Sequence, residues 1–383
     1  MGGYMHGVFL RLVIFLFLVT GVWPAGEGRA QGSAPQSLKQ LIEAARKEGQ
    51  LNWYPVSSLG NENAKEVEKV FNKRFGLNTQ IRADSSGNIS TVFSKAIVES
   101  KTGLPPTFDV MYGPDHRAFE VKEAGGLQKI DNWEALLKEI SPEAYAVRQR
   151  ISPLDIAGYG FLWANRIKNL NFNTDLMTEA ELPQTTIDLG NPKYQGAFPL
   201  SPFVTDAEFG LLVYPKERWM EIVRSWGALN PPIMTYESGI QRMMLGEFKF
   251  MPSNGEYYYE IKRKNPKAPI GIGFFKDLTA NSYIFHVVRK NAKNPNTAKL
   301  FALWSTTPEA NRLYEEEFLL SPNLVLGTGQ IARQLNKLLQ ERNIKVVSWF
   351  DSRENLKKLL YYYETEEGQR YVSEMAKART GRR

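Results

Sequence analysis

The chain has 383 residues, with 48 Lys and Arg against 41 Asp and Glu and a formal net charge of +7. That length corresponds to about two domains, each long enough to bury its own core. Cysteine is absent, which excludes disulfides, thiolate metal sites and cysteine nucleophiles. The excess of positive charge is small and spread along the chain, so we predict no nucleic-acid partner.

Residues 1–30 have the layout of a secretory signal peptide. Arg11 precedes an apolar run at residues 12–23, and Gly28 and Ala30 place small residues at positions −3 and −1 of a cleavage site. A membrane anchor is the alternative, but a spanning helix needs about 20 apolar residues. We therefore predict export, cleavage after Ala30, and a periplasmic mature chain without a membrane span.

Helices and strands alternate in the first part of the mature chain. Apolar residues at a period of 3.6 predict the helices, and short apolar runs between turn residues predict the strands. The expected order is a helix between Ser37 and Gly49, a strand at 51–56, a helix through 64–71 that ends near Gly76, a strand at 77–82, a helix through 89–97, a strand at 108–112 and a helix after Pro114. Such alternation gives a parallel sheet with helices on both faces.

The second half of the chain is richer in turns. We predict strands at 197–200 and 248–251, a helix beginning near Gly255, and another helix after Pro295. A final helix is expected at about 353–363, and the basic tail at 376–383 is expected to be frayed.

Polar residues follow the first three predicted strands, where parallel sheets bind ligands beside helix N-termini. Ser57 and Ser58 follow the first strand, and Tyr112 ends the third. Around the second strand, Arg82 would offer a positive charge to an anion. Ser85 and Ser86 would offer hydroxyl groups and backbone N–H groups. Helix capping by the two serines remains an equal alternative.

Motifs of the common catalytic sites are absent. After cleavage only His116 and His286 remain, and neither belongs to an HExxH zinc motif; no GxSxG or GxxxxGK[ST] stretch occurs. His286 stands in an alternating strand at 283–288 and is expected to be structural. We predict a binding protein rather than an enzyme, although paired carboxylates leave no signature in one sequence.

Four stretches carry a resemblance to a known family: 41–51 (LIEAARKEGQL), 172–176 (FNTDL), 188–196 (DLGNPKYQG) and 294–301 (NPNTAKLF). With them the chain resembles the periplasmic solute-binding proteins of bacterial ABC importers, in the branch that binds ferric iron, thiamine, polyamines and phosphorylated organic compounds.

The resemblance implies an α/β fold of two Rossmann-like lobes joined by crossing hinge strands, the type II periplasmic binding protein fold. Lobe 1 would hold residues 31–148 and 278–328, and lobe 2 would hold 149–277 and 329–383. The first crossing is expected near 112–127 and the return near 275–288.

The implied function is capture of a small solute by lobe closure, followed by delivery to an ABC permease with its own ATPase. The protein would act as a monomer, without a cofactor or covalent chemistry. A periplasmic enzyme or a sensor module on the same bilobed fold is the alternative.

The ligand is expected to be an organic anion, a phosphorylated organic compound or a similar small solute. The resemblance adds Ser201 and Thr205 of lobe 2 to the site and places Glu256 and Tyr257 at the position where ferric-binding relatives have paired tyrosines. Tyr112 and Tyr257 would supply aromatic walls. Ferric-binding relatives hold iron with adjacent tyrosines, so Tyr257 and Tyr258 would be the metal ligands if the cargo is ferric iron. Trp163 would line the hinge or, alternatively, pack in the core.

Overall fold

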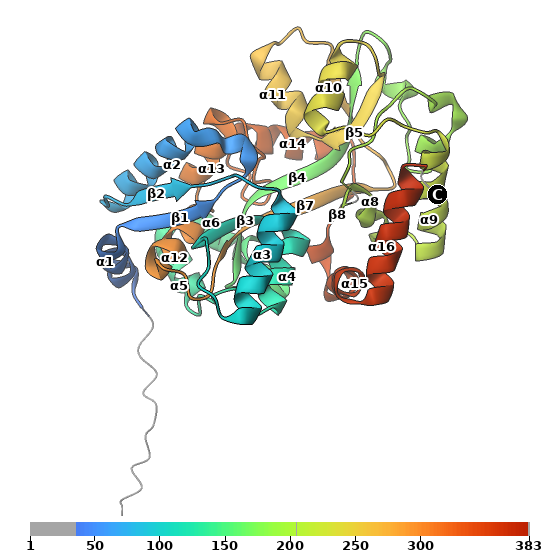
Figure 1. Ribbon diagram of the computed structural model, residues 1–383. Helices are drawn as coiled ribbons and strands as arrows, with labels where there is room; N and C mark the ends of the chain where they lie inside the picture. The colour runs from blue at the N-terminus through green and yellow to red at the C-terminus, as the bar shows by residue number, and fades with distance from the viewer. Residues whose placement is uncertain (1–35, 204, 382–383) are drawn as a thin grey trace, which may run out of the picture. The chain divides into compact units, whose positions relative to one another are not determined.

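The computed structural model describes residues 36–203 and 205–381 (Figure 1). The predicted signal peptide and its cleavage site lie outside these residues. Across the described ranges, no helix combines the length and the apolar composition that a membrane span requires.

The described residues form one mixed sheet of eight strands, in the order β2-β1-β3-β7-β4-β5, with β6 paired to β4 and β8 paired to β7. β1 is parallel to β2 and β3, whereas β7 is antiparallel to both β3 and β4. The strands are β1 Gln50–Tyr54, β2 Gln80–Ala83, β3 Val110–Pro114, β4 Gly160–Asn173, β5 Phe250–Asn254, β6 Ile270–Gly273, β7 Thr279–Val288 and β8 Val346–Val347.

A first group of helices packs around β1, β2, β3 and the end of β7. Its members are α1 Leu38–Glu48, α2 Gly60–Phe75, α3 Ile89–Thr102, α4 Asp115–Glu123, α5 Trp133–Ile140, α6 Pro142–Ala146, α7 Arg148–Ile151, α12 Pro295–Trp304 and α13 Pro308–Arg312. The β-α-β-α-β order predicted for this part of the chain is confirmed.

Local signals account for the helix ends in this group. Ser37 caps α1 by accepting a hydrogen bond from the N–H of Gln40 at 3.3 Å, and Gly49 ends the helix with φ +61°. Gly76 ends α2 in the same left-handed conformation, with φ +62°. Because side chains other than glycine rarely adopt these angles, both glycines stop their helices where the sequence predicts.

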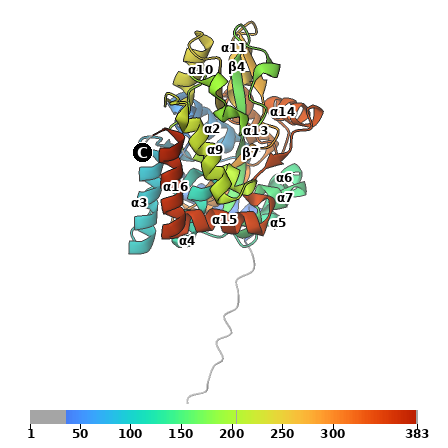
Figure 2. The same cartoon turned by 90° about the vertical axis from the view of Figure 1, so that its right-hand side faces the viewer.

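A second group of helices packs around β5, β6 and the end of β4, or extends from there toward the C-terminus. Its members are α8 Thr205–Glu208, α9 Lys216–Ala228, α10 Tyr236–Met244, α11 Glu256–Lys264, α14 Gln330–Glu341, α15 Arg353–Glu364 and α16 Glu366–Arg379. Figure 2 shows α16 lying along α9, and α15 also contacts α4 of the first group.

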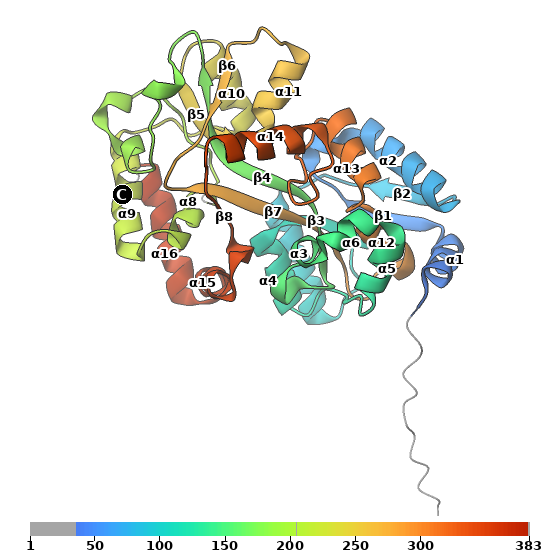
Figure 3. The same ribbon diagram turned by 180° about the vertical axis from the view of Figure 1, so that it is seen from behind.

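β4 and β7 are the long strands that connect the two groups (Figure 3). Residues 160–167 of β4 pair with β7, and residues 168–173 pair with β5 and β6. A third segment lies beside the middle of β4, where the N–H of Asn165 donates to the carbonyl of Pro322 at 2.7 Å and the N–H of Leu324 donates to Asn165 Oδ1 at 2.9 Å.

The aromatic core of the first group surrounds His286. Its ring stacks on Trp163 with centroids 5.3 Å apart, and Trp53 and Phe301 lie within 6 Å. Burial lowers the pKa of His286 to about 3, so the imidazole is neutral at physiological pH. The expected structural role of His286 is confirmed, and Trp163 belongs to the core at 3% exposure.

Three expectations about the fold are wrong. Residues 197–200 form no strand, because Pro199 and Pro202 lack the N–H groups of a ladder and only an isolated bridge joins Leu200 to Ile233. The tail is helical to Arg379, which is 3% exposed and anchors the end of α16. The range 112–127 holds the end of β3 and helix α4, and β4 is the strand that connects the groups.

Candidate ligand-binding site

Arg166 lies in the middle of β4, where the two groups of elements meet. Its Nε is 3.3 Å from Ser321 Oγ and 3.7 Å from Glu256 Oε1, and the Ser321 hydroxyl donates to that same carboxylate oxygen at 3.1 Å. A third of the Arg166 side chain is exposed. Within residues 36–203 and 205–381, its two terminal nitrogens make no hydrogen bond, so their N–H groups are available to an oxyanion.

The charges of Arg166 and Glu256 stabilise each other. Burial lowers the pKa of Arg166, but the nearby Glu256 carboxylate and tyrosines outweigh it and hold the pKa above its ordinary value. Burial raises the pKa of Glu256, and Arg166 opposes that rise. The guanidinium is therefore charged in this setting.

Two pairs of aromatic rings flank Arg166. Tyr54 and Tyr112 stack with centroids 5.5 Å apart, and Tyr236 and Tyr257 lie 5.9 Å apart. Burial raises the pKa of Tyr112 and Tyr257, and it raises that of Tyr54 to about 12. Tyr54, Tyr112 and Tyr257 are therefore neutral phenols at pH 7, and the rings of both pairs offer apolar faces to a ligand.

Lys168 extends the cationic surface along the same strand. Its Nζ donates to Tyr236 Oη at 3.2 Å and to Asn254 Oδ1 at 2.9 Å. Because Arg166 and Lys168 are two residues apart on β4, their side chains leave the same face of the strand.

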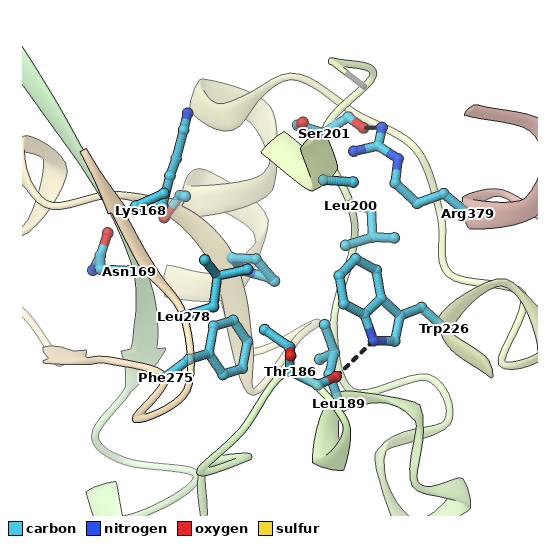
Figure 4. Close-up of a pocket in the computed structure, with 14 residues that line it drawn as sticks. Lys168, Asn169, Thr186, Leu189, Leu200, Ser201, Trp226, Phe275, Leu278 and Arg379 are labelled. Carbon is cyan, nitrogen blue, oxygen red and sulfur yellow. Dashed lines mark hydrogen bonds between the residues drawn. The ribbon is translucent and has the colours of Figure 1, made fainter. Parts of the chain in front are cut away.

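Lys168 also borders a pocket of about 50 Å³ (Figure 4), which we name the Trp226 pocket. Lys168 and Ser201 are polar residues of its lining. Its walls are mainly apolar and include Leu189, Leu200, Trp226, Phe275 and Leu278.

Tyr112, Glu256 and Tyr257 are the predicted site residues that the fold brings together around Arg166. Ser201 lies in the lining of the Trp226 pocket, where its Oγ accepts from the N–H of Phe203 at 3.2 Å. Thr205 begins α8.

The predicted residues of the first strands lie elsewhere. Ser57 and Ser58 begin an exposed 3₁₀ turn after β1. Arg82 is exposed on β2, and in the described part of the chain its side chain makes no hydrogen bond or ion pair. The N–H of Ser86 donates to Asp84 Oδ1 at 2.8 Å, and Ser85 is half-buried.

The capping alternative for the two serines is wrong. Asn88 caps α3 instead, because its Oδ1 accepts from the N–H of Ser90 at 2.8 Å. A binding role for Ser57, Ser58, Arg82, Ser85 and Ser86 stays a prediction.

Sequence reasoning missed Arg166, Lys168 and Tyr236. The signal was present at 160–173 (GFLWANRIKNLNFN), where two cations interrupt a strand of otherwise apolar and amide residues. Charged side chains in so buried a strand need a partner or a ligand.

Tyr257 and Tyr258 have different surroundings. The Tyr257 hydroxyl donates to Glu237 Oε1 at 2.8 Å, whereas the Tyr258 ring packs edge-on against Tyr259 at 5.0 Å. Among the residues that the structure describes, no group of three or more His, Asp or Glu side chains is arranged to hold a metal ion.

Residues 67–324, more than half of the chain, match the family model of the bacterial extracellular solute-binding proteins. The chain belongs to this family. It is a protein that binds a small solute outside the cytoplasm for transport, and its family is one of solute-binding proteins rather than enzymes. No curated protein matches the chain by sequence.

Solved structures of solute-binding proteins share its fold. The ferric binding protein from Campylobacter jejuni is 16% identical with a TM-score of 0.62, over 85% of this chain and 99% of that one. The periplasmic binding protein AfuA from Actinobacillus pleuropneumoniae, with fructose-6-phosphate bound, is 18% identical with a TM-score of 0.60, over 85% and 98% of the two chains. The substrate binding protein of an ABC transporter from Agrobacterium tumefaciens is 14% identical with a TM-score of 0.62, over 88% and 97%. The solute-binding protein has the α/β fold of the type II periplasmic binding proteins.

Proposed function

We propose that this solute-binding protein captures a small organic anion, such as a carboxylate or a phosphorylated compound, and delivers it to an ABC permease with separate ATPase subunits. Arg166 carries the proposal. It is a charged guanidinium at the junction of the two groups of elements, its Nε faces Ser321 and Glu256, and its terminal N–H groups are available. Arginine binds carboxylates and phosphates through two parallel hydrogen bonds, which gives such contacts both strength and geometry.

Capture would occur by closure of two lobes, without covalent chemistry. The proposed lobes are residues 31–148 with 278–328 and residues 149–277 with 329–383, and β4 and β7 would act as the hinge strands. Contacts from both lobes to one solute would stabilise the closed state. The mature protein would begin after Ala30 and act as a monomer.

Ligand screening tests the proposal. A ligand at 100 times its Kd stabilises a protein by about 2.7 kcal/mol, which raises Tm by several degrees. The panel would contain phosphorylated sugars, dicarboxylates, thiamine, polyamines and ferric citrate. We expect one class of anion to raise Tm, and stabilisation by polyamines alone would refute the anionic class.

Isothermal titration of variants would then assign the site. Arg166→Met should weaken anion binding by about 100-fold, since two charge-assisted hydrogen bonds are lost. Arg353→Met, at an exposed arginine at the start of α15, is the matched control and should bind as the wild type does. Equal affinity of both variants would exclude Arg166 from the site. An iron-dependent colour that Tyr257→Phe abolishes would assign ferric iron as the cargo instead.

A further inference from the structure

The Trp226 pocket lies next to the Arg166 site and differs from it in chemistry. Lys168 belongs to both, because it lines the pocket and its Nζ contacts Tyr236 of the aromatic pair. Figure 4 shows Leu278 and Phe275 across the pocket from Leu200 and Trp226, with Lys168 and Ser201 away from the apolar walls.

Two polar groups beside the apolar walls are already engaged, whereas Oδ1 of Asn169, also in the lining, has no hydrogen-bond partner within the described residues. The indole N–H of Trp226 donates to the carbonyl of Thr186 at 2.8 Å, and Oγ of Ser253 accepts from Nδ2 of Asn171 at 2.6 Å. The walls formed by Leu189, Leu200, Trp226, Phe275 and Leu278 therefore present mainly hydrocarbon to an occupant.

The volume limits what the pocket can hold. An apolar cavity of about 150 Å³ takes one benzene molecule, so about 50 Å³ has room for roughly two or three carbon atoms. Whole ligands of binding proteins need several times this volume. The pocket is therefore suited to one end of a solute whose charged group lies elsewhere.

We propose that the Trp226 pocket is a subsite for a compact apolar group of the solute, whose oxyanion is held by Arg166. The cargo is then amphipathic: an anionic group and an apolar end of two or three carbons, separated by a spacer. Residues two apart on a strand are about 7 Å apart. The spacer between the anionic group at Arg166 and the apolar end in the pocket beside Lys168 must therefore cover about this length. This inference rests on the proposed function, because Arg166 must first bind the anion.

Alkyl phosphates of different length test the subsite, with the full mature chain and calorimetric titration. Each buried methylene adds about fourfold in affinity, so two carbons in the pocket make hexyl phosphate bind at least about tenfold more tightly than ethyl phosphate. Acetate and heptanoate form the parallel pair for a carboxylate head group.

Two variants of the pocket should affect the ratio of hexyl to ethyl affinity differently. Leu278 and Ala280 are two residues apart, and both line the pocket, so a larger side chain at 280 extends into it. Ala280→Leu should bring the ratio of hexyl to ethyl affinity close to one, whereas Leu278→Ala should keep or increase it. Leu245→Ala removes an apolar side chain that is 73% exposed, and it should leave the ratio as in the wild type.

The outcomes separate the two proposals. If neither head group binds, and Arg166→Met changes nothing, the anionic function is wrong. If both phosphates bind with equal affinity, or Ala280→Leu leaves the ratio unchanged while Tm shows a folded protein, the subsite is wrong. If the ratio of hexyl to ethyl affinity falls in Leu245→Ala, the gain in affinity comes from nonspecific apolar contact, and the subsite is again wrong.

Discussion

Glu315 is a buried carboxylate whose replacement should stabilise the protein at neutral pH. It belongs to the π-helical turn Leu313–Glu317 and is 1% exposed. Its Oε1 accepts hydrogen bonds from the N–H groups of Ile331 and Ala332 at the start of α14, whereas Oε2 has no hydrogen-bond partner within the described residues. A Cβ on Gly329 would overlap this carboxylate, which shows how tightly it is enclosed.

Burial raises the pKa of Glu315 from its ordinary 4.5 to about 7, against the opposing effect of the two N–H groups. The folded state thus binds this proton more tightly than the unfolded state does. The contribution of Glu315 to the free energy of unfolding is therefore most favourable below pH 4.5 and is lost as the pH rises through about 7. A pKa difference of about 2.5 corresponds to about 3 kcal/mol of lost stability.

Glu315→Gln keeps the shape and the acceptor oxygen but removes the charge. We expect it to raise the free energy of unfolding by about 2–3 kcal/mol at pH 8, and to change it by less than about 1 kcal/mol at pH 4.5. Urea unfolding at the two pH values measures both quantities. Glu317→Gln, at an exposed carboxylate of the same turn, is the control and should stay within about 0.5 kcal/mol of the wild type. A glutamine variant that is no more stable at pH 8 would refute the reasoning.

Three further predictions concern single contacts. Arg166→Met leaves Glu256 buried without its cation, so it should lower Tm more at pH 8 than at pH 5; an equal loss at both would contradict the pairing. Gly227→Ala should lower the free energy of unfolding by about 1–3 kcal/mol, because its Cβ would overlap the Ala378 carbonyl of α16; unchanged urea unfolding would show that α16 moves aside freely. Arg289→Met should lower the free energy of unfolding by about 3–5 kcal/mol in the same assay, because it leaves the buried Glu99, 3.1 Å away, without its cation. A loss below about 1 kcal/mol would show that the Glu99 carboxylate becomes neutral at little cost.

Local chemistry accounts for the part of the fold that sequence reasoning predicts well. The boundaries of α1 and α2 follow from a capping serine and from glycines with positive φ, each of which acts within a few residues. The β-α-β-α-β order follows from hydrophobic periodicity, which reports one buried face per element. The four stretches that resemble the family lie in α1 and β1, at the end of β4, in the turns at 188–196 and in α12, and they led to the correct family.

The failures occur where a distant contact decides the structure. Basic residues at the C-terminus look solvated in the sequence, yet Arg379 reaches the carbonyls of Ser201 and Phe203 across 176 positions or more. Nothing near residue 379 reveals those acceptors, because they belong to a loop that α9 and α16 bring close.

The sequence by itself determined that this is an α/β solute-binding protein and predicted its export, since a signal-peptide layout, periodicity and family segments are all local patterns. Only the tertiary structure decided which residues gather around Arg166, at the proposed site. Arg166 meets Ser321 across 155 positions, and Ser321 meets Glu256 across 65. Such contacts depend on the pairing of β4 with β7 and on the return of the chain beside β4, and one-dimensional patterns carry no record of that pairing.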